Sequence, residues 1–366
     1  MMNANNEQKI DAPQNIKWPF APIADANAVQ ADYGDLLVLT TLGELYGLNL
    51  DTGVQIKLCE VALPKIDHSN DHEHFGISKF RLHSSFDGKY SAVVIDHGQI
   101  GMLIETSCGR IITHLNGGNY CEETVPFSAC FIHIEGQDLL IHRTDWNRLD
   151  VTDPVSGQII TNRLIAPYDS PEKRPEHYLD YFHGKLIPSP NNNQLFDDGW
   201  VWHPLSVPRT WSIKQWLTTY PWESEDGDSI IDFPLGDDWS IPACWIDDHH
   251  IAMWGIPIWD KDEEMEMRAG SGIAIYSLSN SQATIKKSIP IPNKNKCIYL
   301  FSNGRQLYAV TDAGTTIWDI NSEQQVCQLA DFIPQIHNKH NGLLIAFNAN
   351  SISTLSLSTI KFNSEN

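Results

Sequence analysis

Short apolar runs alternate with polar turn residues along most of this chain, and this pattern predicts β-strands rather than helices. It is clearest in the stretch FSNGRQLYAVTDAGTTIWDI, residues 301–320. Asn303-Gly304 lies between two such runs, which predicts a tight hairpin with positive φ at both central residues. Asp312 and Gly314 then predict a second turn before a third strand, Thr315 to Ile320.

The same strand–turn pattern recurs along the chain, which predicts an all-β fold built from repeated units. Its 366 residues divided among seven units give about 52 residues each, against about 40–45 for a typical propeller blade. We therefore expect a seven-bladed β-propeller with one inserted amphipathic helix, the excess residues lying in loops. The expected blades are centred near residues 45, 97, 147, 200, 265, 313 and 350.

The expected domain is a single propeller from residue 16 to residue 360. Residues 1–15 and 361–366 are predicted to be tails, the first of them disordered. The last blade has no outermost strand of its own in the sequence pattern. We expect the segment from Ile16 to Phe20 to supply that strand and close the ring.

The segment from Thr210 to Tyr220, TWSIKQWLTTY, departs from the strand pattern. Its apolar residues recur at the spacing of one helix face, Thr210 or Ser212 suits the start, and Pro221 ends it. Two interpretations remain open for this helix: it covers the edge of a blade, or it binds a partner. The residues of the apolar face are Ile213, Trp216, Leu217 and Tyr220.

Residues 301–320 resemble a WD repeat, because Trp318-Asp319 and Asp312 stand where such repeats place their Trp-Asp pair and a structural aspartate. The stretch FDDGWVWHPLSVPRTWSIKQWL, residues 196–217, resembles a segment of one bacterial group of such propellers. The chain thus resembles WD-repeat-like bacterial β-propellers. The resemblance implies a platform that binds proteins, although some members of this broad family are enzymes.

Charge narrows the classes of partner. The chain has 46 acidic and 25 basic residues, a formal net charge of −21. This excess repels phosphate backbones and anionic membranes, so neither nucleic acid nor a membrane is an expected partner. It favours a basic protein or peptide, and without that partner we expect a monomer.

Three further features lead us to expect a cytoplasmic protein. The first residues have no apolar core of a signal peptide, and no run of 18 apolar residues occurs. The seven cysteines are odd in number and scattered through apolar runs, which is typical of a reducing compartment.

The sequence contains none of the usual nucleotide-binding, serine-hydrolase or zinc-protease motifs. We therefore expect no enzymatic activity and no cofactor. The best metal candidate is DHSNDHEH, residues 67–74, where His68, His72 and His74 would suit zinc or nickel. The alternative is a solvated loop between the first two blades.

Tryptophan and negative charge are concentrated in one region. Nine of the twelve tryptophans lie between residues 200 and 259, and residues 222–266 hold fourteen carboxylates but one basic residue, a local charge of 1 − 14 = −13. Tryptophan is frequent at binding hot spots, and carboxylates steer basic partners. The predicted partner-binding residues are Trp222, Glu223, Asp226, Asp228, Trp259, Asp262, Glu263 and Glu264.

The competing interpretation of this region is structural. Trp202, Trp245 and Trp254 lie inside apolar runs and are expected in the blade core, while the acidic residues could form a solvated loop.

Three functions remain open from the sequence. The first is a non-enzymatic platform for a basic protein, such as an immunity protein or antitoxin that neutralises a basic toxin. The second is a carbohydrate-binding propeller or glycosidase, which aromatic platforms and paired carboxylates would serve. The third is a metal-dependent enzyme that uses His68, His72 and His74.

Overall fold

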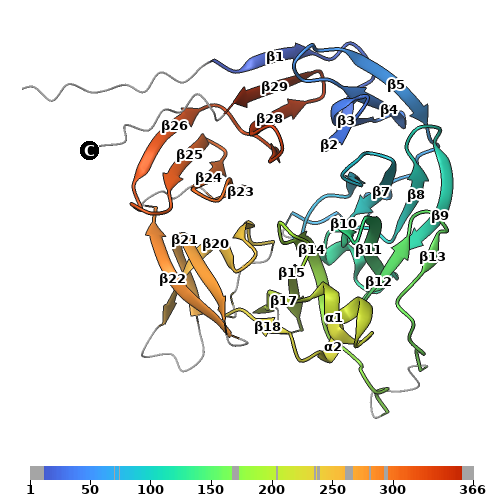
Figure 1. Ribbon diagram of the computed structural model, residues 1–366, viewed down its shortest axis with the longest axis vertical. Coiled ribbons are helices and arrows are strands. Elements are labelled where there is room, and N and C mark those ends of the chain that lie inside the picture. Colours follow the sequence, from blue (N-terminus) through green and yellow to red (C-terminus); the bar gives the residue numbers. More distant parts are fainter. Residues whose placement is uncertain are drawn as a thin grey trace, which may run out of the picture.

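Seven antiparallel sheets form a ring in this computed structural model (Figure 1). The structure describes residues 12–69, 71–73, 75–166, 173–202, 205–234, 236, 240–259, 267–279, 282–291 and 296–356. The predicted seven-bladed all-β propeller is confirmed, and the expected blade centres fall within the chain spans of seven separate sheets, although residue 265 itself lies outside the described residues. Of the predicted tails, residues 1–11 and 361–366 lie outside the described residues, whereas Gln14 and Asn15 belong to a strand.

Blades 1, 2 and 3 each contain four strands that follow one another in sequence order from the centre of the ring outwards. Blade 1 consists of β2 (Ile23–Ala31), β3 (Gly34–Thr40), β4 (Glu44–Leu48) and β5 (Gln55–Glu60). Blade 2 consists of β6 (Lys79–Ser84), β7 (Tyr90–Asp96), β8 (Ile100–Glu105) and β9 (Arg110–Asn116). A 3₁₀ turn (Glu122–Thr124) leads into blade 3, which consists of β10 (Ala129–Ile134), β11 (Gln137–Asp145), β12 (Arg148–Asp153) and β13 (Gln158–Ile159).

Blade 4 is the irregular one, because it carries an extra strand and both α-helices of the described residues. It consists of β14 (Phe182–Pro188), β15 (Gln194–Val201), β16 (Leu205–Ser206), β17 (Arg209–Ser212) and β18 (Ile231–Asp232). Helices α1 (Ile213–Thr218) and α2 (Glu223–Asp226) lie between β17 and β18.

Blades 5 and 6 return to the regular pattern. Blade 5 consists of β19 (Ala243–Asp247), β20 (His250–Trp259), β21 (Met267–Ser279) and β22 (Gln282–Pro290). Blade 6 consists of β23 (Tyr299–Ser302), β24 (Gln306–Thr311), β25 (Gly314–Asp319) and β26 (Gln325–Ala330).

Blade 7 joins the two ends of the chain. Its strands are β27 (Ile336–Asn338), β28 (Leu343–Asn348), β29 (Ser351–Ser356) and, from the N-terminal end, β1 (Gln14–Lys17). β1 pairs antiparallel with β29, with Ile16 opposite Ile352. The expected closing strand is therefore present, starting two residues earlier than predicted.

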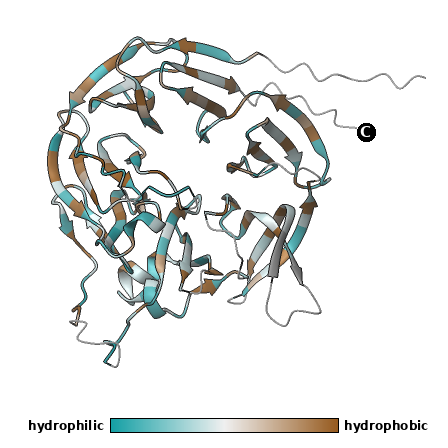
Figure 2. Cartoon of the chain, turned by 180° about the vertical axis from the view of Figure 1, so that it is seen from behind, coloured by the Kyte–Doolittle hydropathy of each residue, from teal (hydrophilic) through white to brown (hydrophobic). Residues whose placement is uncertain are grey.

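Apolar residues on the inner strands fill the spaces between neighbouring blades. One such cluster joins Leu36 and Val38 of blade 1 to Ile345 and Ile352 of blade 7. Hydrophobic and hydrophilic residues alternate along the outermost strands, which face solvent on one side (Figure 2). The core is thus spread over the blade interfaces, which is how a chain of this length avoids one oversized core.

The predicted helix is present but shorter than its pattern, spanning Ile213–Thr218. Ser212 caps it by accepting a hydrogen bond from the Gln215 amide. Ile213 and Trp216 are buried between blades 3 and 4, beside Trp211. This packing supports the interpretation in which the helix covers a blade.

The hairpin at Asn303-Gly304 differs from its prediction, since only Gly304 has positive φ. Three residues separate β23 from β24, and the Asn303 side chain accepts hydrogen bonds from the amides of Arg305 and Gln306. This is the longer hairpin loop with a glycine in the left-handed region. In the next turn Asp312 is exposed, and the Thr311 hydroxyl makes the hydrogen bond to Gly314.

Blade 4 buries a carboxyl group beside the inner strand. Asp198 of β15 lies opposite Lys185 of β14 and is 7% exposed. Burial, and then the neighbouring charge of Asp197, raise the pKa of Asp198 to about 8. The native protein therefore retains a proton on Asp198 that the unfolded chain has released near neutral pH.

Asp198→Asn is expected to stabilise the protein at high pH. Between about pH 4 and about pH 8 the native state holds more protons than the unfolded state, so wild-type stability declines as the pH rises. The asparagine variant lacks this decline, so its stability relative to the wild type should rise by about 3 kcal/mol between pH 6 and pH 9. Urea unfolding at the two pH values measures the gain. If the two proteins differed in stability by the same amount at pH 6 and pH 9, the prediction would be contradicted. The control is Asp51→Asn, which removes a carboxylate from an exposed turn.

Candidate functional site

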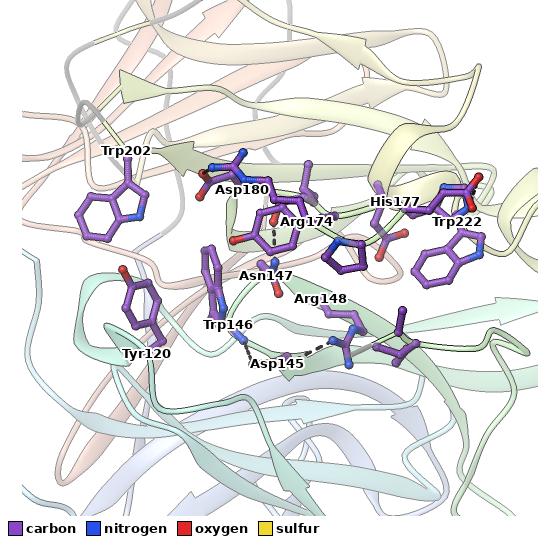
Figure 3. A pocket seen from close by; sticks show the side chains of 17 residues that line it. Tyr120, Asp145, Trp146, Asn147, Arg148, Arg174, His177, Asp180, Trp202 and Trp222 are labelled. Carbon is purple, nitrogen blue, oxygen red and sulfur yellow. Dashed lines mark hydrogen bonds and ion pairs between the residues drawn. The ribbon is translucent and has the colours of Figure 1, made fainter. Parts of the chain in front are cut away.

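A cleft of about 710 Å³ opens between blades 3 and 4 (Figure 3). The turn between β11 and β12 forms one wall, and the connection from blade 3 to blade 4 forms the other. Trp202, just beyond β15, and Trp222, just before α2, lie at opposite ends. The remaining lining residues used below are Tyr120, Asp145, Trp146, Arg148, Arg174, Glu176, His177, Tyr178, Asp180 and Glu225.

The cleft exists because the outer strand of blade 3 is cut short. β13 has two residues, and after the Ile160 amide bonds to Val151 the backbone leaves the sheet. Side chains then replace the missing strand: the Thr161 hydroxyl accepts from the Val151 amide, and Arg163 donates to the Leu149 carbonyl. The chain beyond is free to form the outer wall of the cleft.

Arg163 joins the two blades at the floor of this region. Its side chain is 1% exposed and pairs with Asp150 of β12 at 2.9 Å and with Glu225 of α2 at 2.6 Å. It also donates to the Pro221 carbonyl, and its guanidinium lies 4.9 Å from the ring centre of Trp222. Burial raises the pKa of Glu225, while the Arg163 charge acts in the opposite direction. Two carboxylates and a ring thus surround one buried cation.

His177 forms the end of the cleft next to Trp222. Its backbone φ of 62° is in the left-handed region, which costs a non-glycine residue roughly 1–2 kcal/mol. Its Nδ1 lies 2.7 Å from Asp226, and its ring stacks on Trp222 at 4.6 Å. Tyr220 donates to Asp226 at 2.9 Å, and burial followed by this hydrogen bond raises the pKa of Tyr220 to about 12. These contacts hold the connection between blades 3 and 4 against α2.

Aromatic rings form the opposite end of the cleft. Tyr120 lies 5.0 Å from Trp146 and 6.2 Å from Trp202, in edge-to-face geometry. Beneath them Phe182 and Trp200 are buried and stacked, with ring centres 4.3 Å apart. The buried pair supports the exposed rings from below and fixes their orientation.

The charged groups in the cleft are mostly paired with one another. Asp145 lies 3.5 Å from Arg148, and Asp180 lies 3.4 Å from Arg174. Glu176 differs, because its side chain is 89% exposed and its closest ionic contact is His177 at 3.9 Å. The rim of the cleft therefore carries an accessible carboxylate, while its interior combines rings with weak, displaceable ion pairs.

The structure brings part of the sequence-predicted partner site to this cleft. Trp222 lines the cleft, and the Asp226 carboxylate lies within hydrogen-bond distance of His177. Asp228 is exposed and lies two residues further along the chain. Glu223 is 2% exposed and accepts hydrogen bonds from Ser229, so it stabilises the α2 loop from inside. The rest of the predicted set is not placed: Asp262, Glu263 and Glu264 lie outside the described residues, as does the side chain of Trp259.

The predicted histidine site is described in part, because His74 lies outside the described residues. His68 pairs with Asp71 at 2.8 Å, and Asp71 also accepts from the Ser78 amide. His72 forms an isolated bridge with Gly76. Among the residues that the structure describes, no group of three or more potential ligands is arranged to hold a metal ion. The three-histidine site stays a prediction.

Several residues of the cleft were not identified from the sequence. Trp202 was expected in the blade core, and that prediction is wrong, since 42% of it is exposed. It lies one residue past the end of β15, where the strand alternation no longer applies. Trp245 is buried as expected, and Trp254 is partly buried. Tyr120, Trp146, Arg163 and His177 carry no sequence pattern that distinguishes them.

Within the described part of the chain, no helix is long and apolar enough to cross a membrane.

Comparison with known proteins gives likeness in fold but not in sequence. No protein-family model matches the chain. No curated protein matches it either. Solved structures do match, and the three described next do so at 10–12% identity and over 94% of this chain.

Three of these structures are propellers of similar size. The structure of U3-55K has a TM-score of 0.55 at 12% identity, over 98% of that chain. The β-propeller domain of Cps50 (Swd1) from Myceliophteria thermophila has a TM-score of 0.59 at 11% identity, over 100% of that chain. The WD40 β-propeller domain of Doa1 has a TM-score of 0.51 at 10% identity, over 96% of that chain. Likeness at this identity extends to the fold alone: the chain is a seven-bladed β-propeller, similar in fold to these WD40 structures.

Proposed function

We propose that this protein is a non-enzymatic propeller that binds a basic protein or peptide in the cleft between blades 3 and 4. The observation that carries the proposal is the cleft itself: about 710 Å³, with aromatic walls at both ends and Glu176 exposed at its rim. WD40-type propellers commonly mediate protein binding, and a chain of net charge −21 attracts basic partners.

The size and composition of the cleft suit a peptide segment of such a partner. Tryptophan and tyrosine are enriched at interface hot spots, because they bury a large area at low entropic cost. Trp202 and Tyr120 at one end and Trp222 at the other offer such area, with carboxylates between them. In its narrowest form, the proposal is that the partner is a basic toxin which this protein neutralises as its immunity protein.

Glu176→Lys is expected to weaken the binding of a fluorescently labelled lysine-rich peptide about tenfold at about 0.05 M salt, and less at about 0.5 M. The reason is that Glu176 supplies an exposed negative charge at the rim. Fluorescence anisotropy measures the affinity, and a glutamate-rich peptide of equal length is the negative probe.

Glu135→Lys is the matched control for this experiment. Glu135 is an exposed carboxylate in the β10–β11 turn, at the opposite end of blade 3 from the β11–β12 turn of the cleft. The Glu135→Lys variant therefore makes the same change in charge at a position away from the cleft. Equal weakening by both variants would mean that only total charge matters, and the cleft would not be the binding site.

Carbohydrate binding is the second candidate, because ring faces beside Asn147, Asp145 and Asp180 would also suit sugar rings and hydroxyls. A glycan array distinguishes the two functions. Glycan binding that Trp202→Leu abolishes, together with no binding of the lysine-rich peptide, would replace the protein-binding proposal.

A further inference from the structure

The aromatic end of the cleft places exposed rings and a carboxylate along the same cavity. We infer that Tyr120, Trp202 and Asp180 form a subsite that binds one arginine side chain of the basic partner. This inference rests on the proposed function, and it adds the chemical group that is recognised. All three residues line the cleft, and in the view of Figure 3 Asp180 lies between Trp202 and Arg174.

The chain already binds its own arginines in this way around the cleft. Arg163 lies 4.9 Å from the Trp222 ring centre and pairs with Glu225, while Arg174 lies 5.2 Å from the Tyr178 ring centre and pairs with Asp180. In each case an aromatic face and a carboxylate hold the same guanidinium. A planar cation satisfies both at once, since it stacks on the ring while its edge donates to the carboxylate.

Together with Asp180, the rings of Tyr120 and Trp202 offer the same combination of an aromatic face and a carboxylate, at accessible positions. They are 47% and 42% exposed, and the cation–π contacts of the described residues fall on other rings: Phe127, Tyr178, Tyr181 and Trp222. Neighbouring exposed apolar groups often mark interaction sites, and these two rings line a cleft.

The subsite is rigid before any ligand arrives. Trp202 is held edge-to-face by Trp200 at 5.4 Å and by Phe182 at 5.3 Å, and both of these rings are buried. Tyr120 also stacks on Phe182 at 6.1 Å. Because the rings are already oriented, an arginine would lose its own freedom on binding but would not have to order the site.

Asp180 has capacity for a second cation. Its pair with Arg174 is long, at 3.4 Å, and both side chains are partly exposed, so the pair contributes little energy. A carboxylate can accept several hydrogen bonds, so an incoming arginine can bind beside Arg174 or replace it. Arg174 is then a competitor for the site rather than part of it.

The test compares three versions of one labelled peptide, with a single arginine, with citrulline, or with lysine at the same place. We expect the arginine peptide to bind about tenfold more tightly than the citrulline peptide, which has the same shape without charge. Lysine should fall between them, because it cannot stack as a plane. Trp202→Leu and Asp180→Asn should each reduce the preference for arginine over citrulline to less than about twofold.

Arg174→Gln is the decisive variant, because it removes the cation that competes for Asp180. We expect it to tighten binding of the arginine peptide about threefold. If Arg174 only supported the structure, the variant would bind this peptide equally or more weakly. Phe86→Ala is the matched aromatic control, since Phe86 is exposed in a turn on the other face of the ring. Circular dichroism confirms that each variant is folded.

The outcomes separate this inference from the proposed function. If the lysine-rich peptide binds and depends on Glu176, but arginine and citrulline peptides bind equally, the function stands and the arginine subsite is refuted. If no cationic peptide binds at all, both proposals fail.

Discussion

A variant that lacks residues 1–20 is expected to lose at least about 3–5 kcal/mol of its free energy of unfolding, the cost of removing one large buried aromatic side chain. The deletion removes β1 and with it Trp18, which is 2% exposed and packs against Tyr46 of blade 1 at 5.3 Å. Ile16 is lost from the same cluster, and β29 loses its outer partner. Urea unfolding followed by circular dichroism measures the loss.

The control for this deletion stops short of the closing strand. A variant lacking residues 1–11 keeps β1 and should unfold at the same urea concentration as the full chain. Adding a synthetic peptide of residues 12–22 to the longer deletion should restore stability in proportion to peptide concentration. If the longer deletion were as stable as the shorter one, pairing of β1 with β29 would contribute nothing to ring closure.

Arg163→Met is expected to destabilise the protein by about 3–5 kcal/mol, because removing one partner from a buried ionic network leaves the others uncompensated. Asp150 and Glu225 are both nearly buried and would lose their shared cation. The variant should also lose binding of the cationic peptide, since α2 carries Trp222 and is tied to blade 3 through Arg163. Urea unfolding and fluorescence anisotropy measure the two effects.

Arg110→Met is the matched control, because Arg110 pairs with Glu105 at 2.8 Å on the outer strand of blade 2, where both side chains are exposed. Exposed pairs contribute less than about 1 kcal/mol. The argument also predicts that Arg163→Met combined with Glu225→Gln costs less than the sum of the single variants. Strict additivity would mean that Arg163 and Glu225 do not stabilise one another.

The features that the sequence could predict are the local ones. Turn residues and strand alternation are set by neighbours in the chain, so the blade positions, the closing strand and the helix from Ile213 followed from them. The cleft is different, because it assembles Tyr120, Trp146 and Trp202 from three separate connections. No sequence spacing encodes that proximity.

The exposure of Trp202 and the burial of Arg163 show where sequence reasoning fails. An apolar run around Trp202 predicted a core position, but the strand ends at Val201 and the ring turns into the cleft. Arg163 lies three residues after the exposed Ile159-Ile160 pair and resembles any surface cation in the sequence, yet it fills the place of missing strand backbone. Both outcomes depend on where a strand stops, which is the least predictable property of a strand.

The strand order also fixes how the molecule can be attached to other proteins. Both ends of the propeller meet in blade 7, and two whole blades separate that blade from the cleft in either direction around the ring (Figure 1). A domain fused or tethered at either end is held on the far side of the ring and leaves the cleft open. A partner bound between blades 3 and 4, as we propose, would therefore leave blade 7 accessible for attachment.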